Sequence, residues 1–269
     1  MRKVGFVGAG NMAGALVKGL LATKRYRARE IWASDADARQ LRRLKRAYGI
    51  EGTRDNAALV KASAVVVLAV KPQIMDAVLG EIRPAVTRRH LVVSIAAGVP
   101  TRRLETGLGA GARVVRVMPN TPALVGAAMT VLVRGTRATA ADERLTAALF
   151  GGVGDVIRVK DERLMDAVTG LSGSGPAFVY RFAEGLIAGA VAAGLPRATA
   201  ARLAYQTIAG AARMLQETGR VPEDLRAMVT SPGGTTLAGL QALEEGDFFV
   251  TVAAAVRAAT RRSRELGRN

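Results

Sequence analysis

The sequence contains no cysteine and only one histidine, His90. Without cysteine the chain has no disulfides, thiolate metal ligands or thiol nucleophiles. With a single imidazole, a zinc site would have to be built from carboxylates around it, and a histidine base with a histidine partner is excluded. We therefore expect metal-free chemistry and no metal site. Because His90 lies in a charged turn just before an expected strand, we expect it at the surface and outside any catalytic site.

Long apolar runs are also missing. Arg and Lys interrupt every apolar stretch before it reaches the roughly 18 residues of a membrane span, so we expect no membrane partner. A strand-like run at 3–7 begins almost at Met1 and leaves no room for a separate leader. We expect an intracellular protein, located in the cytoplasm.

Acidic residues are scarce relative to basic ones: Asp and Glu number 22, Lys and Arg 39, and the formal charge is +17. Such an excess raises the question of a nucleic-acid partner. The basic residues are scattered along both halves, however, and aromatic side chains, on which bases would stack, make up only 4% of the chain. We expect no nucleic acid as partner. Part of the positive potential would instead steer an anionic cofactor and substrate toward their cleft.

The first half alternates short β-branched runs with amphipathic stretches, which predicts a parallel sheet covered by helices. The run 64–70 is continuously apolar, as a strand covered on both faces requires. We expect strands at 3–7, 30–34, 64–70, 90–95, 112–117 and 129–133, and helices that include 12–21, 38–48 and 73–82.

After the strand-like run 155–159 the pattern becomes rich in Ala, Leu and Arg at helical spacing. We expect an α/β protein with two domains, a parallel-sheet domain at 1–160 and an all-α domain at 161–269. The segment 176–194 is apolar on most faces, which predicts that it packs against a partner subunit. The expected helices of this domain are 162–172, 176–194, 197–218, 222–230, 235–246 and 248–266.

A glycine-rich loop, residues 8–13, follows the first expected strand and leads into a helix. The first glycine makes a tight turn, the second lets the backbone approach a pyrophosphate, and a small third residue lets helix and strand pack closely. Since the loop stands between a strand and a helix at the start of a β-α-β series, the pattern predicts a dinucleotide site.

The second strand ends in Ser34 and Asp35. An acidic residue here would bind the ribose 2′-hydroxyl of NAD, whereas a hydroxyl or an arginine such as Arg39 would suit the 2′-phosphate of NADP. An alternative is that Asp35 only caps the following helix. We expect NADPH as cofactor, with NADH as an alternative.

Three later strand ends should line the rest of the cofactor cleft, because ligands of such sheets bind outside the carboxyl ends of the strands. They are 69–72, 94–98 and 117–122. Lys71 is the basic group at these ends, and its alternative role is that of a solvated lysine. The predicted cofactor-binding residues are Gly8, Gly10, Asn11, Met12, Ser34, Asp35, Arg39, Asn56, Ala69, Val70, Lys71, Pro72, Ala97 and Asn120.

Together the motifs resemble the pyrroline-5-carboxylate reductases. The resembling residues are 4–13, 69–72, 118–122, 166–177 and 231–236, so the resemblance spans nearly the whole chain. It implies reduction of Δ1-pyrroline-5-carboxylate to L-proline with NAD(P)H, the last step of proline synthesis. It also implies an N-terminal Rossmann-type domain and a C-terminal helical domain that binds substrate and builds homodimers, in many members assembled into decamers.

Residues 231–236 form a Gly-rich turn followed by an expected helix, whose free backbone N–H groups would suit a small carboxylate. A plain helix cap by Ser231 or Thr235 is the alternative. The resemblance implies a substrate site made of Ser231, Gly233, Gly234, Thr235 and Thr236. In it the Ser231 hydroxyl and the amides of Gly234 and Thr235 hold the carboxylate, and Thr236, the catalytic residue, hydrogen-bonds the ring nitrogen.

Two other enzyme classes fit less well. Residues 172–176 resemble the nucleophile elbow of hydrolases, but a helix and not a strand is expected before them and no histidine is near in sequence. We expect a helix-breaking turn there, near the nicotinamide. A 3-hydroxyacid dehydrogenase would use a lysine base on a long helix, and no lysine follows Lys160.

Overall fold

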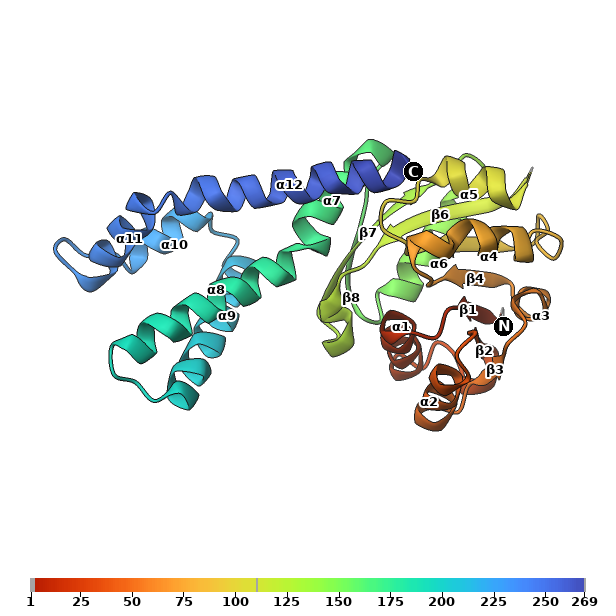
Figure 1. Cartoon of the computed structure of the whole chain (residues 1–269), viewed down its shortest axis with the longest axis horizontal. Coiled ribbons are helices and arrows are strands. Elements are labelled where there is room, and N and C mark those ends of the chain that lie inside the picture. The colour runs from red at the N-terminus through yellow and green to blue at the C-terminus, as the bar shows by residue number, and fades with distance from the viewer. Residues whose placement is uncertain (1–2, 110, 269) are drawn as a thin grey trace. The chain divides into compact units, whose positions relative to one another are not determined.

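The computed structural model describes residues 3–109 and 111–268. Eight strands of this part of the chain form one sheet with the order β3-β2-β1-β4-β5-β6-β7-β8 (Figure 1). The strands are β1 (Val4–Val7), β2 (Ile31–Ser34), β3 (Glu51–Thr53), β4 (Val65–Leu68), β5 (Leu91–Ser94), β6 (Arg113–Met118), β7 (Ala128–Arg134) and β8 (Gly154–Arg158). This is the α/β architecture that the sequence predicts.

Strand direction differs from the expectation at one place. The pairs from β3 to β6 are all parallel, but β7 runs antiparallel to β6, and β8 is parallel to β7. A parallel crossover needs a dozen or more residues, usually with a helix. Only 119–127 connect β6 to β7, and a 3-10 turn at Thr121–Val125 occupies most of them. The expected strand 129–133 is therefore antiparallel to the strand before it.

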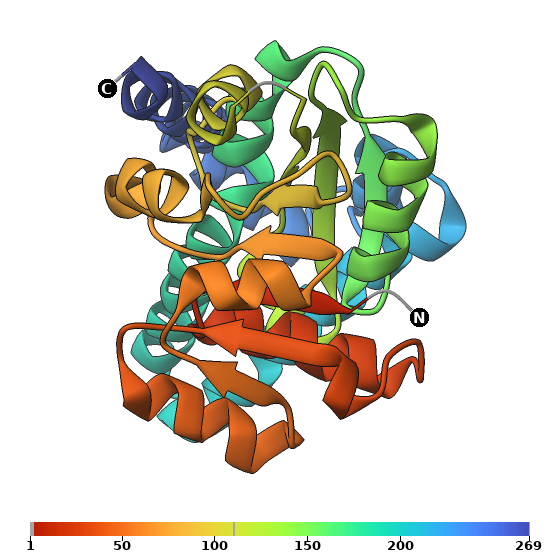
Figure 2. The same cartoon turned by 90° about the vertical axis from the view of Figure 1, so that its right-hand side faces the viewer.

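Helices cover both faces of the sheet (Figure 2). Buried side chains of α1, α2 and α6 pack on one face, and those of α3, α4 and α5 pack on the other. Strand β4 serves both, since Val65 and Val67 belong to the first cluster and Val66 and Leu68 to the second, each at most 1% exposed. These helices are α1 (Asn11–Ala22), α2 (Ala38–Tyr48), α3 (Asn56–Ala62), α4 (Met75–Ile82), α5 (Thr101–Leu108) and α6 (Ala140–Phe150).

The chain divides into two compact units. Unit 1 contains the described residues up to Ser174 together with those from Ala258 onward, and unit 2 is Gly175–Arg257. The expected all-α segment 161–269 thus contributes to both units. Its helices are α7 (Met165–Val168), α8 (Gly175–Ala192), α9 (Arg197–Thr218), α10 (Pro222–Met228), α11 (Thr235–Glu245) and α12 (Phe248–Arg268).

Unit 2 leaves much apolar surface uncovered. Its small buried cluster consists of side chains from α8 and α9, around Ile187 and Ala200. A groove of about 830 Å³ runs between α8, α11 and α12, and Phe182, Leu186 and Phe248 line it. None of the helices in the described part of the chain combines the length and the hydropathy needed to cross a membrane.

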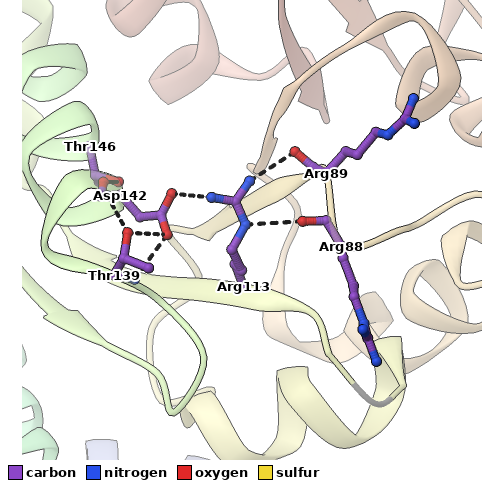
Figure 3. Close-up of polar contacts among 6 residues, drawn as sticks. All are labelled: Arg88, Arg89, Arg113, Thr139, Asp142 and Thr146. Carbon is purple, nitrogen blue, oxygen red and sulfur yellow. Dashed lines mark hydrogen bonds and ion pairs between the residues drawn. The ribbon is translucent and has the colours of Figure 1, made fainter.

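The turn before β5 is held by a charged network at the amino edge of the sheet (Figure 3). Arg113 on β6 donates to the backbone oxygens of Arg88 at 3.2 Å and Arg89 at 2.8 Å, and pairs with Asp142 at 2.5 Å. Asp142 is 2% exposed and also accepts hydrogen bonds from the backbone N–H and the hydroxyl of Thr139. The Arg113 guanidinium therefore links the turn at 88–89, before β5, to the turn at Thr139, before α6, through the buried carboxylate of Asp142.

His90, in the same turn, is buried at 8% exposure, so the expectation of a surface histidine is wrong. Its Nδ1 accepts the backbone N–H of Thr87 at 2.9 Å, which folds the turn over the ring. The residue lies at the amino end of β5, at the edge opposite the carboxyl ends where ligands bind. The expectation that His90 is not a catalytic residue stays a prediction.

The buried imidazole predicts a pH dependence of stability. Burial is the main cause that lowers the pKa of His90 below its ordinary value of 6.5. As the pH falls through about 6.5, the unfolded chain takes up the proton first, so stability present at higher pH is lost, by about 1.4 kcal/mol for each unit of pKa difference. His90→Asn keeps an acceptor for Thr87 and should weaken this acid sensitivity. Urea unfolding from about pH 7.5 to 5 measures it, and equal pH slopes for both proteins would contradict it.

Candidate functional site

The glycine loop after β1 has the backbone geometry of an anion-binding turn. Gly8 has φ +100°, and a Cβ on it would lie 2.6 Å from the backbone oxygen of Ala69, so only glycine fits. At Gly10, by contrast, no described atom lies within 4 Å of the place a Cβ would take. Gly10 is the N-cap of α1, and no described side chain caps this helix. The N–H groups of its first turn are therefore available to a pyrophosphate, and the residues fit a dinucleotide.

Side chains from β2 and α2 hold the middle of this loop. Oδ2 of Asp35 accepts the Ala9 N–H at 2.8 Å, and its Oδ1 accepts the Asp37 N–H at 2.8 Å. Nη2 of Arg43 donates to the Ala9 oxygen at 3.0 Å, and its Nη1 lies 3.3 Å from Oδ1 of Asn11. The backbone N–H of Ala9 is thus bonded to Asp35 and its carbonyl oxygen to Arg43.

These contacts decide between the alternatives for Asp35. The residue that caps α2 is Asp37, whose side chain accepts the Arg39 N–H at 2.8 Å, so the interpretation of Asp35 as the cap is wrong. Arg39 forms an exposed ion pair with Asp37, which lowers the pKa of that carboxyl. Sequence reasoning missed Arg43, because one of several basic residues of α2 carries no signal until the loop is seen beside it.

Ser34 and Asn56 lie together next to this end of the sheet. The buried hydroxyl of Ser34 donates to Oδ1 of Asn56 at 2.6 Å, and Nδ2 of Asn56 donates to Glu81 at 2.8 Å. Helix α2 begins beside them and carries Arg39, Arg42, Arg43, Lys45 and Arg46. The surroundings of β2's carboxyl end are therefore polar, and the basic residues of α2 would suit a 2′-phosphate although Asp35, Asp37 and Glu81 stand there as well.

The other predicted cofactor residues follow β4, β5 and β6 at the same edge, because β1, β2, β4, β5 and β6 are parallel. Ala69 and Val70 are half-buried, Lys71 is exposed, and Pro72 opens a 3-10 turn. Ala97 is half-buried after β5. Asn120, after β6, accepts the Met129 N–H at 3.0 Å and donates to the Ser172 oxygen at 3.2 Å.

The segment 169–173 shows the form of the expected turn before the long helix. It is a π-helical turn that follows α7, in which the Ser174 N–H bonds the Thr169 oxygen at 2.9 Å, and the single turn residue Ser174 separates it from α8. A Cβ on Gly173 would lie 2.5 Å from Cε of Met118, at the end of β6. The extra residue of a π-turn lets the helix pass this strand end closely, and such turns are frequent at functional sites.

The second glycine turn, 231–236, lies in unit 2. Gly233 has φ +68°, the Gly234 N–H bonds the Ser231 oxygen at 3.0 Å, and Gly234 is the N-cap of α11. No described side chain caps this helix, so the interpretation of Ser231 or Thr235 as a cap is wrong. In the described part of the chain no hydrogen bond engages the hydroxyls of Ser231 and Thr236. The first turn of α11 thus presents free N–H groups suited to a small carboxylate.

Among the described residues, no three His, Cys, Asp or Glu side chains are placed to share a metal ion. The two sites that the chain does build are both glycine turns at uncapped helix N-termini, one in each unit. Backbone N–H groups and the helix dipole at such turns favour negative charge.

Comparison with known proteins identifies both halves. Residues 162–266 match the family model described as pyrroline-5-carboxylate reductase dimerisation, and residues 3–98 match the one described as NADP oxidoreductase coenzyme F420-dependent. A pyrroline-5-carboxylate reductase of Methanosarcina acetivorans is 45% identical over 267 residues, which cover 99% of this chain and 98% of the relative.

Solved structures agree. A pyrroline-5-carboxylate reductase from Coxiella burnetii superposes with a TM-score of 0.91 at 38% identity, covering 98% of both chains. The pyrroline carboxylate reductase of Plasmodium falciparum, solved with NADP bound, superposes with a TM-score of 0.90 at 32% identity, covering 99% of this chain and 98% of that one.

The contacts of Asp35 predict how its loss affects the cofactor. Since both carboxylate oxygens hold the glycine loop, Asp35→Ala should raise the KM for NADPH and for NADH by a similar factor, about tenfold, the cost of about one or two buried hydrogen bonds. Initial rates with each cofactor measure this. Asp155→Asn, at an exposed carboxylate on the edge strand β8, serves as the control and should change neither KM. A rise in KM for NADH alone would show instead that Asp35 binds the ribose 2′-hydroxyl.

Proposed function

This chain belongs to the pyrroline-5-carboxylate reductase family, and we infer that it reduces Δ1-pyrroline-5-carboxylate to L-proline with NAD(P)H. The observation that carries this conclusion is that the match to named reductases runs through nearly the full length of both chains. Both glycine turns therefore lie within the matched sequence. The protein is an oxidoreductase.

For the cofactor, we propose that the first turn of α1, with Gly8, Gly10, Asn11 and Met12, holds the pyrophosphate. The reduced nicotinamide supplies the hydride. The remaining residues proposed to line its cleft are Ala69, Val70, Lys71, Pro72, Ala97 and Asn120, at the carboxyl ends of β4, β5 and β6.

The proposed preference for NADPH rests on the contacts around β2. Ser34 and Asn56 bond each other there, and the exposed Arg39 would reach a 2′-phosphate by leaving its ion pair with Asp37. Asp35, the residue that would favour NADH, is hydrogen-bonded to the glycine loop. The cationic helix α2 adds attraction for a third phosphate group.

For the substrate, we propose that the carboxylate binds the turn of Ser231, Gly233 and Gly234 and the amide of Thr235. The Thr236 hydroxyl, half-buried on the first turn of α11, would hydrogen-bond the ring nitrogen. An imine is easily protonated to a more electrophilic iminium, so this chain needs no strong acid. Its main contribution is orientation of two bound molecules, an effect worth up to about 7–11 kcal/mol.

The activity is tested by following NADPH absorbance with racemic pyrroline-5-carboxylate. NADPH oxidation that depends on the pyrroline is the expected result, and its absence together with tight, salt-sensitive DNA retention would overturn the assignment.

We also propose that the protein acts in the cytoplasm, at the last step of proline synthesis. The step in proline synthesis is tested by expressing the chain in a proline auxotroph that lacks this reductase. Growth without added proline is the expected result.

Thr236→Ala is expected to lower kcat/KM for the pyrroline by about tenfold, the value of about one hydrogen bond to a polar group, and to leave NADPH affinity nearly unchanged. Thr199→Ala, at an exposed threonine on the first turn of α9, is the matched control. Steady-state kinetics with the pyrroline varied, and NADPH binding followed by fluorescence, separate the two effects. An unaltered kcat/KM in Thr236→Ala would remove Thr236 from the mechanism.

We further propose that the helical segment 161–269 binds substrate and builds a homodimer through unit 2. The dimerisation model matches 162–266, and the groove between α8, α11 and α12 leaves apolar side chains such as Phe182 and Leu186 exposed. A second copy would remove this surface from water, which is favourable by about 25 cal/mol for each Å² of apolar area. A decamer built from such dimers is the larger assembly proposed.

A charge placed in this groove should weaken the dimer. Leu186→Arg puts an unpaired cation against apolar side chains, a cost of several kcal/mol on association, and should shift the mass toward the monomer at low micromolar concentration. Light scattering coupled to gel filtration measures the mass and separates dimer from decamer. Ile157→Arg, on the exposed edge strand β8 of unit 1, is the matched control and should leave the mass unchanged. Equal masses for both variants would contradict an interface at α8.

A further inference from the structure

The loop between β5 and α5, residues 95–100, is held at its end by a side chain from the second half of the chain. Glu162 accepts the backbone N–H of Thr101 at 2.7 Å and the Thr101 hydroxyl at 2.5 Å. Arg116 on β6 pairs with the same carboxylate at 3.0 Å. Thr101 and Arg116 are 7% and 5% exposed. The start of α5 is therefore anchored through a nearly buried ion pair.

The C-terminal end of α12 lies beside α5 (Figures 1 and 2), and it packs against the same loop at Gly98. Gly98 has φ +74°, and a Cβ on it would lie 3.2 Å from Cβ of Leu266 and 3.4 Å from the Ser263 oxygen. A Cβ on Gly267 would lie 2.6 Å from the Gly98 oxygen, closer than such contacts occur. The two backbones thus approach each other as closely as two glycines permit.

A hydrogen bond fixes α12 in this position. The Ser263 hydroxyl, on a residue only 3% exposed, donates to Oδ1 of Asp166 at 2.7 Å. Asp166 stands four residues after Glu162, one helical turn along, so the same short segment anchors α5 through Thr101 and α12 through Ser263. Ser263 and Gly267 are themselves four residues apart and lie on the same face of α12. All of these residues belong to unit 1.

We propose that the last turns of α12, through Ser263 and Gly267, are a positioning element for the cofactor loop Ile95–Gly98. This inference rests on the proposed function, which places Ala97 at the nicotinamide end of the cleft. In this loop Ala96 is buried and Ala97 is half-buried. The next residue, Gly98, has a positive φ, and glycine can adopt many other backbone conformations at little cost. Core packing of Ala96 and Val99 holds the loop on either side, and the contact with α12 adds a restraint at Gly98 itself. A displacement of about 1 Å at a reacting group can cost about 100-fold in rate.

Gly267→Ala tests the proposal, because the added methyl must move Gly98 or the helix end. Alanine favours a helix over glycine, so the variant does not weaken α12 itself. We expect kcat/KM for NADPH to fall by about tenfold or more, while the dissociation constant of 2′,5′-ADP, a probe of the adenosine half only, stays unchanged. Ser263→Ala, which removes the bond to Asp166 without adding bulk, should act in the same direction.

Gly80→Ala is the matched control, since Gly80 lies in α4 of unit 1 and no described atom lies within 4 Å of the place its Cβ would take. It should change neither quantity. Parallel weakening of NADPH and 2′,5′-ADP in Gly267→Ala, or unchanged kinetics in both α12 variants, would overturn the positioning role. Failure of the unmodified protein to oxidise NADPH with the pyrroline would instead overturn the proposed function, so the two failures are distinguishable.

Discussion

The close approach of the carboxyl ends of β1 and β4 is the constraint on which the cofactor end of this protein depends. At Gly8 the backbone turns away from β1 with a positive φ, and the neighbouring Ala69 oxygen leaves no room for a Cβ. This turn places the first N–H groups of α1 outside the sheet edge, where no described side chain caps them. Asp35 and Arg43 then hold the Ala9 peptide from both sides, so charged hydrogen bonds act together with the packing of the buried Ala9 to keep the shape of the loop.

Backbone groups make up most of each candidate anion site. Both candidate sites are glycine turns at uncapped helix N-termini, which attract negative charge without a dedicated cation in contact. Several arginines are meanwhile committed to structure: Arg113 joins two turns through buried Asp142, and Arg116 supports Glu162 beneath α5. The formal charge of +17 therefore contains groups with separate tasks, and those along α2 stand near the cofactor turn.

Particular elements show how far the sequence leads. The apolar run 64–70 predicts a strand buried on both faces, and β4 is one. Strand periodicity carries no direction, however, so the reversal of β7 was not predictable without knowing that 119–127 form a short turn. The turn before β5 looks polar in sequence, yet it folds over His90 because Arg113 and Thr87 hold it closed. The segment 172–176 reads as a helix breaker because it holds two glycines and a proline, but Gly173 ends a π-helical turn, and Gly175 and Pro176 already begin α8.

By itself, the sequence determined the α/β class, the helices of the second half, both glycine turns and the family resemblance, because each of these depends on residues close together along the chain. Tertiary structure alone decided what those residues touch. It assigned Asp35 to the glycine loop rather than to a helix cap, brought Arg43 to Ala9 across 34 positions, and set the end of α12 against Gly98. Such contacts join residues distant in sequence, and which partner a polar or small residue finds is fixed only when packing brings the two backbones together.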